Sequence, residues 1–253
     1  MNTRQAIRAL ITGGASGLGL ATAQSIINSN GKVAILDINE ENGQQALKQL
    51  GDNAIFLRTD VSHEQQVDEA VDKIVDRFGY INLAVNCAGI APSQRVLGKD
   101  ALMSTEDFAK TVAINLTSTF CVSRAAANAM QTNIPQQDDE RGVIINTASI
   151  AAFDGQIGQS AYAASKGGIA SMTLPLAREF ARFGIRVVTI APGLFKTPLF
   201  DKLPEKAIDA LRESIPFPGR IGEPDEFAAL VLHIFNNKML NGEVIRLDGA
   251  LRM

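Results

Sequence analysis

A tyrosine and a lysine four residues apart, Tyr162 and Lys166, are the strongest candidates for chemistry in this sequence. Residues at this spacing share one face of a helix, so the ammonium group of Lys166 can lie near the phenol. A phenol has an ordinary pKa of about 10 and is a poor base at neutral pH. A cation about 4 Å away favours the phenolate by roughly 4 kcal/mol at an effective dielectric constant of about 20. We therefore predict that the pKa of Tyr162 comes within reach of pH 7 and that it serves as general acid and base for a carbonyl or alcohol oxygen.

Ser149 supplies a second hydroxyl group close to this pair. It stands at the end of a predicted buried strand, residues 142–149, and the helix that carries Tyr162 follows it. A serine in this position can hold the same substrate oxygen as the tyrosine. These residues can move a proton, but a carbonyl–alcohol interconversion also needs a hydride partner, so we expect a redox cofactor elsewhere in the chain.

A glycine-rich turn near the N-terminus predicts where such a cofactor binds. Residues 6–12 form an apolar, β-branched run, Gly13, Gly17 and Gly19 follow it, and residues 20–27 favour a helix. Strand, glycine turn and helix is the context in which backbone N–H groups at a helix N-terminus bind a pyrophosphate. The spacing is Gly-x-x-x-Gly-x-Gly and not Gly-x-Gly-x-x-Gly, and an ordinary tight turn between strand and helix is the alternative interpretation.

An acidic residue at the end of the next strand decides between these interpretations. Residues 32–37 form a second apolar strand that ends in Asp37, 20 residues after Gly17. A carboxylate at this distance accepts hydrogen bonds from the adenosine ribose hydroxyls and repels a 2′-phosphate. No arginine follows directly, since the next residues are Ile-Asn-Glu-Glu. The sequence therefore predicts NAD in preference to NADP.

Strands alternate with helices along the whole chain, without a repeat, a linker or a break in composition. This pattern predicts one domain, residues 1–253, an α/β doubly wound fold with a parallel seven-stranded sheet flanked by helices. The predicted strands are 6–12, 32–37, 54–59, 81–86, 142–149, 186–191 and 243–247, and the later helices are 40–50, 63–78, 105–130, 159–183 and 224–236. Loops are expected at 91–104 and 132–141. Residues 194–216, with a short helix near 205–213, are a candidate lid over the site.

Composition excludes several other classes of protein. The net charge of −3 gives no electrostatic footprint for nucleic acid, and no apolar run is long enough to span a bilayer. Cys87 and Cys121 both lie in apolar contexts, which predicts free buried thiols in a reducing compartment. His63 and His233 stand alone in a polar and an apolar helix, so no metal site is predicted. Because the first strand begins almost at once, we expect no targeting segment and a cytoplasmic location.

Six features of the sequence together resemble the short-chain dehydrogenase/reductase family in order and spacing. They are Thr12-Gly13-x-x-x-Gly17-x-Gly19, Asn86-Cys87-Ala88-Gly89, Asn115, Ser149, Tyr162-x-x-x-Lys166 and Pro192-Gly193. The resemblance covers essentially the whole chain. One departure is Cys87, which replaces the second asparagine of the family's usual Asn-Asn-Ala-Gly, and we expect it to leave the chemistry unchanged.

This resemblance implies specific roles for the site residues. The implied catalytic residues are Asn115, Ser149, Tyr162 and Lys166. On pattern alone Asn115 is a mid-helix asparagine that is exposed or bonded to backbone; the resemblance makes it the residue that fixes a water relaying protons to Lys166. The implied contacts of NAD are Gly13, Ser16, Gly17, Leu18, Gly19, Asp37, Asp60, Val61, Cys87, Ala88, Gly89, Tyr162, Lys166, Pro192, Gly193, Phe195 and Thr197.

Four further segments resemble one branch of this family, which oxidises the 3-hydroxyl of 3-hydroxyacyl-CoA thioesters. The segments are 144–153, 190–195, 203–206 and 240–250. This resemblance implies that Ser149, Gln159 and Tyr162 face the acyl substrate, and that the protein is a homotetramer built on the helices near 105–130 and 159–182. The alternatives are a hydroxysteroid or other secondary-alcohol dehydrogenase, a 3-oxoacyl carrier-protein reductase, and a non-catalytic NAD-binding regulator. The presence of all four catalytic positions argues against the regulator, and Asp37 argues against the reductase, which usually takes NADPH.

Overall fold

A seven-stranded parallel sheet forms the centre of the computed structural model, which describes residues 5–99, 101–197 and 211–253. The strand order is β3-β2-β1-β4-β5-β6-β7, and every neighbouring pair is parallel. The strands are β1 Arg8–Thr12, β2 Lys32–Asp37, β3 Ala54–Arg58, β4 Leu83–Asn86, β5 Gly142–Thr147, β6 Ile185–Pro192 and β7 Val244–Leu247. The predicted doubly wound architecture is confirmed.

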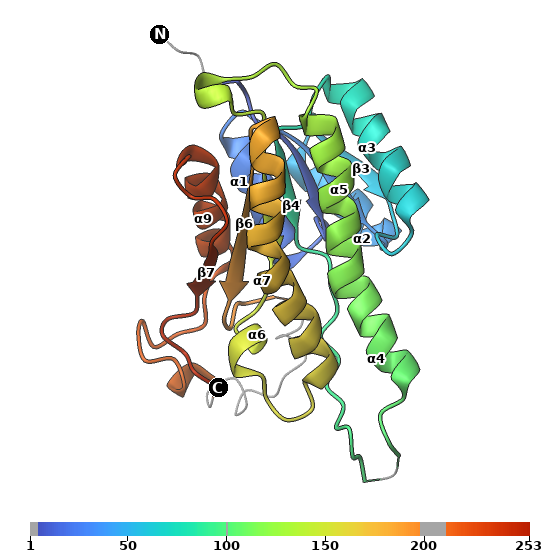
Figure 1. Ribbon diagram of the computed structural model, residues 1–253, viewed down its shortest axis with the longest axis vertical. Coiled ribbons are helices and arrows are strands. Elements are labelled where there is room, and N and C mark those ends of the chain that lie inside the picture. The colour runs from blue at the N-terminus through green and yellow to red at the C-terminus, as the bar shows by residue number, and fades with distance from the viewer. Residues whose placement is uncertain (1–4, 100, 198–210) are drawn as a thin grey trace.

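Helices cover both faces of this sheet (Figure 1). They are α1 Gly17–Asn28, α2 Glu40–Leu50, α3 Glu64–Phe78, α4 Thr105–Val112, α5 Ser118–Met130, α6 Ala151–Asp154, α7 Ser160–Phe180 and α9 Pro224–Asn236. Alternate strand residues point to opposite faces. Ile11 and its equivalents pack against α1, α2 and α9, whereas Leu10 and its equivalents pack against α3, α5 and α7. Because both faces are covered, β5 and β6 are buried at every position.

The structure differs from the sequence predictions in three places. The predicted helix 105–130 is interrupted by a π-helical segment, Ala113–Thr117, where Thr119 Oγ1 donates to the carbonyl oxygen of Asn115 at 2.7 Å. Side-chain hydrogen bonds to the helix backbone leave no trace in hydrophobic periodicity, so the interruption could not be predicted. The predicted loop 132–141 contains a short 3₁₀ helix, Gln137–Asp139.

The third difference concerns the serine of the predicted site. Strand β5 ends at Thr147, so Ser149 lies beyond the strand, at the entry to the short helix α6. The predicted lid lies mostly outside the described residues: positions 198–210 are not described, and the helix predicted near 205–213 falls largely there.

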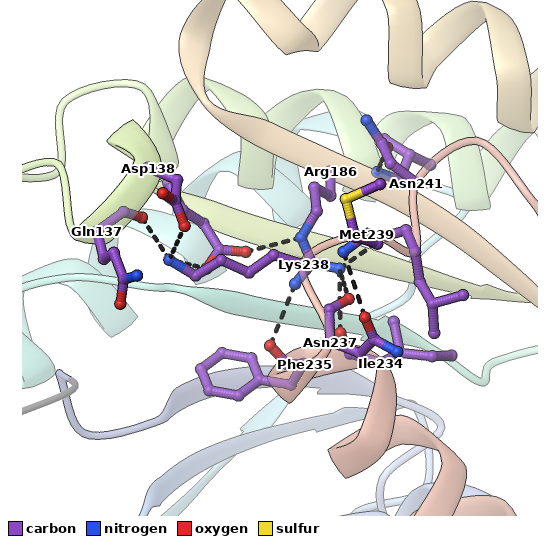
Figure 2. Close-up of polar contacts among 12 residues, drawn as sticks. Gln137, Asp138, Arg186, Ile234, Phe235, Asn237, Lys238, Met239 and Asn241 are labelled. Atoms are coloured by element: carbon purple, nitrogen blue, oxygen red, sulfur yellow. Dashed lines mark hydrogen bonds and ion pairs between the residues drawn. The ribbon is translucent and has the colours of Figure 1, made fainter.

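A buried arginine joins β6 to the end of α9, at the opposite end of the sheet from the carboxyl ends of the strands. Figure 2 shows Arg186 with its guanidinium directed at this helix end. It pairs with Glu140 at 2.7 Å and donates to the carbonyl oxygens of Ile234, Phe235, Asn237 and Leu240 at 2.8–3.3 Å. Lys238 extends the same group of contacts to Asp138. We call these residues the Arg186 cluster.

Candidate active site

Helix α7 carries both members of the tyrosine–lysine pair at the carboxyl end of the sheet. The Nζ atom of Lys166 lies 5.8 Å from the centre of the Tyr162 ring. Lys166 is only 6% exposed, and its ammonium donates a hydrogen bond of 2.7 Å to the carbonyl oxygen of Thr147, the last residue of β5. The predicted proximity of the two side chains is therefore present, with the lysine anchored to the sheet.

Ser149 meets Tyr162 from the loop between β5 and α6. Its side chain is buried, and its Oγ accepts a hydrogen bond of 3.1 Å from the backbone N–H of Ala151. Ser149 lies close enough to Tyr162 to lower the pKa of its phenol. Two hydroxyl groups that come from separate elements thus converge, as a site that holds one substrate oxygen requires.

Burial controls the electrostatics of this site more strongly than the sequence suggests. Burial of the phenol raises the pKa of Tyr162 above its ordinary value, and Ser149 offsets this only in part. Burial also lowers the pKa of Lys166 to about 8, against a smaller opposite effect of Cys87. The prediction that Lys166 lowers the pKa of the phenol toward 7 is wrong for the chain alone, because desolvation of the buried phenol raises its pKa and Lys166, which donates to Thr147, is not among the groups that lower it. At neutral pH this phenol keeps its proton.

Asn115 occupies the π-helical segment next to Lys166 and is fully buried. Its amide Nδ2 donates to the carbonyl oxygen of Ile90 at 2.9 Å and to Ser165 Oγ at 3.0 Å, and its Oδ1 accepts from the N–H of Ile90 at 2.8 Å. A Cβ atom at Gly89 would lie 3.0 Å from this Oδ1 and 3.7 Å from Lys166 Nζ. Asn115 and Lys166 therefore share one narrow space beside the end of β4. Single π-turns of this kind occur frequently at functional sites.

The glycine turn after β1 has the backbone that a phosphate site requires. Gly13 and Gly17 adopt φ angles of 62° and 51°, in the left-handed region that favours glycine. A Cβ at Gly19 would lie 2.3 Å from the carbonyl oxygen of Gly13. Ser16 is the N-cap of α1 without a side-chain capping bond, and the first turn, which includes Leu18, has no acidic residue. The N–H groups of this turn can therefore bind a dinucleotide pyrophosphate.

Asp37 lies beside this turn, at the end of β2. Its Oδ2 accepts from the N–H of Ala15 at 3.3 Å, and its Oδ1 accepts from the N–H of Asn39 at 3.0 Å. The carboxylate is thus held next to the glycine turn, where it can meet the ribose of a nucleotide whose phosphates the turn binds. The residues present fit the expected dinucleotide.

The remaining predicted cofactor contacts lie at the ends of neighbouring strands. Cys87 and Ala88 follow β4; the N–H of Ala88 donates to Thr12 Oγ1 at 3.2 Å, and burial raises the pKa of the Cys87 thiol to about 11. Asp60 and Val61 follow β3, and Asp60 accepts from Ser62 in a local turn. Both cysteines are free thiols, as predicted, but only Cys121 is buried and Cys87 is partly exposed.

The last predicted site residues lie in two places. Four of them stand at or just after the end of β6, and Gln159 stands at the start of α7. Pro192 ends β6, and the N–H of Gly193 donates to the carbonyl oxygen of Leu247 at 2.9 Å. Phe195 is buried against Gly222. Thr197 is the last residue before the undescribed stretch. Gln159, the N-cap of α7, is half-buried and its Oε1 accepts from Gln156. Sequence reasoning missed Ser165 and Ile90 as partners of Asn115, because backbone contacts and helix-internal serines carry no motif.

Within the described ranges, no three His, Cys, Asp or Glu side chains are grouped to hold a metal ion. No helix of the described residues is long and apolar enough to cross a bilayer.

Comparison with known proteins agrees with this geometry. The profile of the short chain dehydrogenase family matches residues 8–208. Human 3-hydroxyacyl-CoA dehydrogenase type-2 is 52% identical over 247 residues, which cover 97% of this chain and 95% of the relative. The protein of the same name from Drosophila melanogaster is 50% identical over 96% of each chain. The crystal structure of 3-hydroxyacyl-CoA dehydrogenase type-2 from Mycobacterium avium superposes with a TM-score of 0.94 at 39% identity, over 98% of this chain and 96% of the other. The chain belongs to the short-chain dehydrogenase family.

Proposed function

We propose that this chain catalyses the reversible, NAD-dependent oxidation of the 3-hydroxyl group of 3-hydroxyacyl-CoA thioesters. The observation that carries the proposal is the convergence of Tyr162, Ser149 and Lys166 at the carboxyl end of the sheet, next to Asn115. Support for the substrate class comes from relatives of that name, which match about half of the residues over nearly the whole chain. A nicotinamide cofactor is general in this family, and its preferred form is argued below.

The residues divide the reaction into a proton transfer and a hydride transfer. Ser149 and Tyr162 hold the substrate oxygen, and in oxidation the O–H bond breaks as its proton passes to the Tyr162 oxygen. A bound NAD, held by the glycine turn after β1 and by Asp37, would supply the acceptor for the hydride that leaves C3 as the C=O bond forms, and its positive charge would favour the phenolate. Lys166, cationic below its pKa of about 8, stabilises the phenolate that precedes the transfer. In the reverse direction the protonated phenol donates to the carbonyl oxygen.

The same geometry explains why the chain alone keeps a neutral phenol. Burial raises the pKa of Tyr162, so Tyr162 is ready to act as the acid of carbonyl reduction. The oxidation direction requires positive charge near the phenol, which Lys166 supplies in part. This makes turnover in the two directions differ in pH dependence, with oxidation favoured at higher pH.

A substrate panel tests the proposal. The protein is mixed with NAD and, in turn, a short-chain 3-hydroxyacyl-CoA, a hydroxysteroid and a simple secondary alcohol, and the absorbance of reduced cofactor is followed. We expect the highest kcat/KM for the thioester. A higher value for the steroid would replace the proposed substrate with that alternative, and no reduction of NAD with any substrate would support the non-catalytic regulator.

Tyr162→Phe tests the proton acceptor within the same assay. We expect turnover to fall by about 10³-fold, because general acid–base catalysis contributes on the order of 10²–10⁴, while NAD affinity changes little. Tyr80→Phe is a matched control: Tyr80 is the other tyrosine of the chain, and its hydroxyl donates to Ala6 far from the site. Wild-type turnover in Tyr162→Phe would overturn the assignment.

The preference for NAD rests on Asp37 and has its own test. Asp37→Ala removes the carboxylate that is expected to accept from the ribose hydroxyls and to repel a 2′-phosphate. We expect the ratio of kcat/KM for NAD over NADP to fall by at least about tenfold, which is about 1.4 kcal/mol. An unchanged ratio assigns the preference to other residues. The homotetramer and the cytoplasmic location stay predictions.

A further inference from the structure

Ser165 stands between the two catalytic positions of α7 and is fully buried. Its hydroxyl donates a hydrogen bond of 2.7 Å to the carbonyl oxygen of Tyr162. The hydroxyl oxygen of Ser165 also accepts a hydrogen bond of 3.0 Å from Nδ2 of Asn115. One hydroxyl group therefore bonds to two of the four residues of the site.

These bonds extend a chain of contacts across three elements. Beyond Ser165, the Asn115 amide makes two hydrogen bonds to the backbone of Ile90, in the loop after β4. The connection thus runs from this loop, through the π-helical segment, to the turn of α7 that carries Tyr162. Asn115 and Ser165 at its centre are fully buried, where an unmade hydrogen bond is costly, whereas Ile90 at its end is 38% exposed.

The hydroxyl group also determines which way the amide points. A serine hydroxyl has a single proton, and here it is committed to the Tyr162 carbonyl, so toward Asn115 the oxygen can only accept. Nδ2 must then face α7, and Oδ1 must face the Ile90 N–H and the small space beside Gly89 and Lys166. A rotated amide would place two donors, Nδ2 and the Ile90 N–H, against each other.

A helical serine often bonds to a carbonyl three or four residues earlier without any further role. Ser165 differs because its acceptor side is used by a site residue. We propose that Ser165 is a positioning residue of the dehydrogenase reaction, which holds the Asn115 amide in one orientation and ties it to the turn that carries Tyr162. The inference rests on the proposed function for its assay.

Ser123 offers a matched control on α5. It is also fully buried, donates to the carbonyl oxygen of Thr119 at 2.7 Å, and accepts from an asparagine amide, Nδ2 of Asn86, at 3.2 Å. Both variants therefore remove a donor to a helical carbonyl oxygen and an acceptor of an asparagine amide, and Ser123→Ala also removes a longer contact of 3.3 Å to Oδ1 of Asn146. We expect similar losses of thermal stability but different effects on turnover.

The test is a double-mutant cycle in the NAD-reduction assay. We expect Ser165→Ala to lower kcat about tenfold with both KM values within twofold, and Ser123→Ala to keep kcat within twofold of wild type. In an Asn115→Ala background, Ser165→Ala should lower kcat less than twofold further, since the residue it orients is gone. A purely structural role predicts equal losses for the two serines and additivity in the cycle.

Either of two results would overturn the inference: wild-type kcat in Ser165→Ala, or the same tenfold loss with and without Asn115. The proposed function can fail separately. If wild type oxidises a steroid or a secondary alcohol but no 3-hydroxyacyl-CoA, the substrate assignment is wrong, and the cycle is measured with the substrate that is turned over.

Discussion

Two buried cations at opposite ends of the sheet, Lys166 and Arg186, are equally hidden from water but differently partnered. Their exposed fractions are 6% and 7%. Arg186 pairs with Glu140 at 2.7 Å and also bonds to four carbonyl oxygens. Among the described residues, Lys166 has one hydrogen-bond acceptor, the carbonyl oxygen of Thr147, and no carboxylate within ion-pair distance.

The difference shows what each end of the sheet is for. A buried charge costs several kcal/mol unless hydrogen bonds and an opposite charge compensate it. The Arg186 cluster supplies that compensation, and its planar guanidinium suits several carbonyl oxygens at once. Lys166 lacks it, so burial lowers its pKa to about 8 and leaves its positive charge available to a neighbouring phenolate. A buried charge that its partners compensate only in part thus distinguishes the candidate active site from the Arg186 cluster.

The largest effect is expected for the activity of Lys166→Met. The change removes the cation that lies 5.8 Å from the centre of the Tyr162 ring, and we expect kcat to fall at least about 10³-fold, which is about 4 kcal/mol. Because the variant also removes an incompletely compensated charge, its free energy of unfolding at pH 7 should equal or exceed that of wild type. Turnover assays and urea denaturation on the same preparation check both. A less stable, fully active variant would contradict the comparison.

Arg186→Met should show the reverse pattern. The change takes from Glu140 its nearest charged partner and from four carbonyl oxygens their donor, so we expect a loss of about 3 kcal/mol in unfolding free energy. The cluster lies at the other end of the sheet from Tyr162, and kcat per folded molecule should stay within about twofold. Denaturation curves, with turnover normalised to folded protein, measure both quantities. If kcat falls as far as in Lys166→Met, the two ends do not differ in role.

The sequence alone does not show how far the charge of either buried cation is compensated by its partners. The strands, the glycine turn and Asp37 were predictable because apolar runs, glycines and strand-end carboxylates each leave a local pattern. The Tyr162-x-x-x-Lys166 spacing also predicted the shared helix face. The pattern could not show that burial of the phenol dominates its pKa, since desolvation depends on elements far apart in the chain.

Longer-range contacts explain the other omissions. Arg186 is a single arginine in an apolar strand, and its partners on α9 are backbone carbonyl oxygens that follow it by about fifty positions. Asn115, in the π-helical turn, bonds to the loop after β4 and to α7. Its catalytic role was expected only from family resemblance, and the network through Ser165 was not expected at all.

The pH dependence of stability sharpens the comparison at the lysine end. Lys166 has a pKa of about 8 when folded and an ordinary value of 10.5. Below pH 8 both states carry the proton, and the cost of burying the charge is present in full. Between pH 8 and 10.5 the folded state loses the proton first, so the unfolded state binds more protons and stability rises with pH. The stability advantage of Lys166→Met over wild type should therefore shrink by about 2 kcal/mol between pH 7 and pH 10.

Measuring the difference between the two proteins matters, because burial also raises the pKa of Cys87 to about 11. That thiol keeps its proton longer in the folded state, which lowers stability from about pH 9 to 11, and because Lys166 lowers the pKa of this thiol the loss is larger in Lys166→Met and adds to the expected shrinkage. Urea denaturation at four or five pH values gives the difference directly. An advantage that stays constant with pH would show that Lys166 is not titrating in this range.

The smallest effect is expected at the edge of the Arg186 cluster. Lys238 bonds to Asp138 at 3.1 Å and to the carbonyl oxygen of Gln137 (Figure 2), but its side chain is 27% exposed and that of Asp138 is 67% exposed. Exposed pairs of this kind are worth about 0–1 kcal/mol and weaken with salt. Lys238→Met should therefore cost about 0.5 kcal/mol in low salt and less at about 1 M salt, whereas the loss in Arg186→Met should persist. A loss in Lys238→Met as large as in Arg186→Met, and equally insensitive to salt, would show that the cluster depends on its outer ion pair and not on the buried guanidinium.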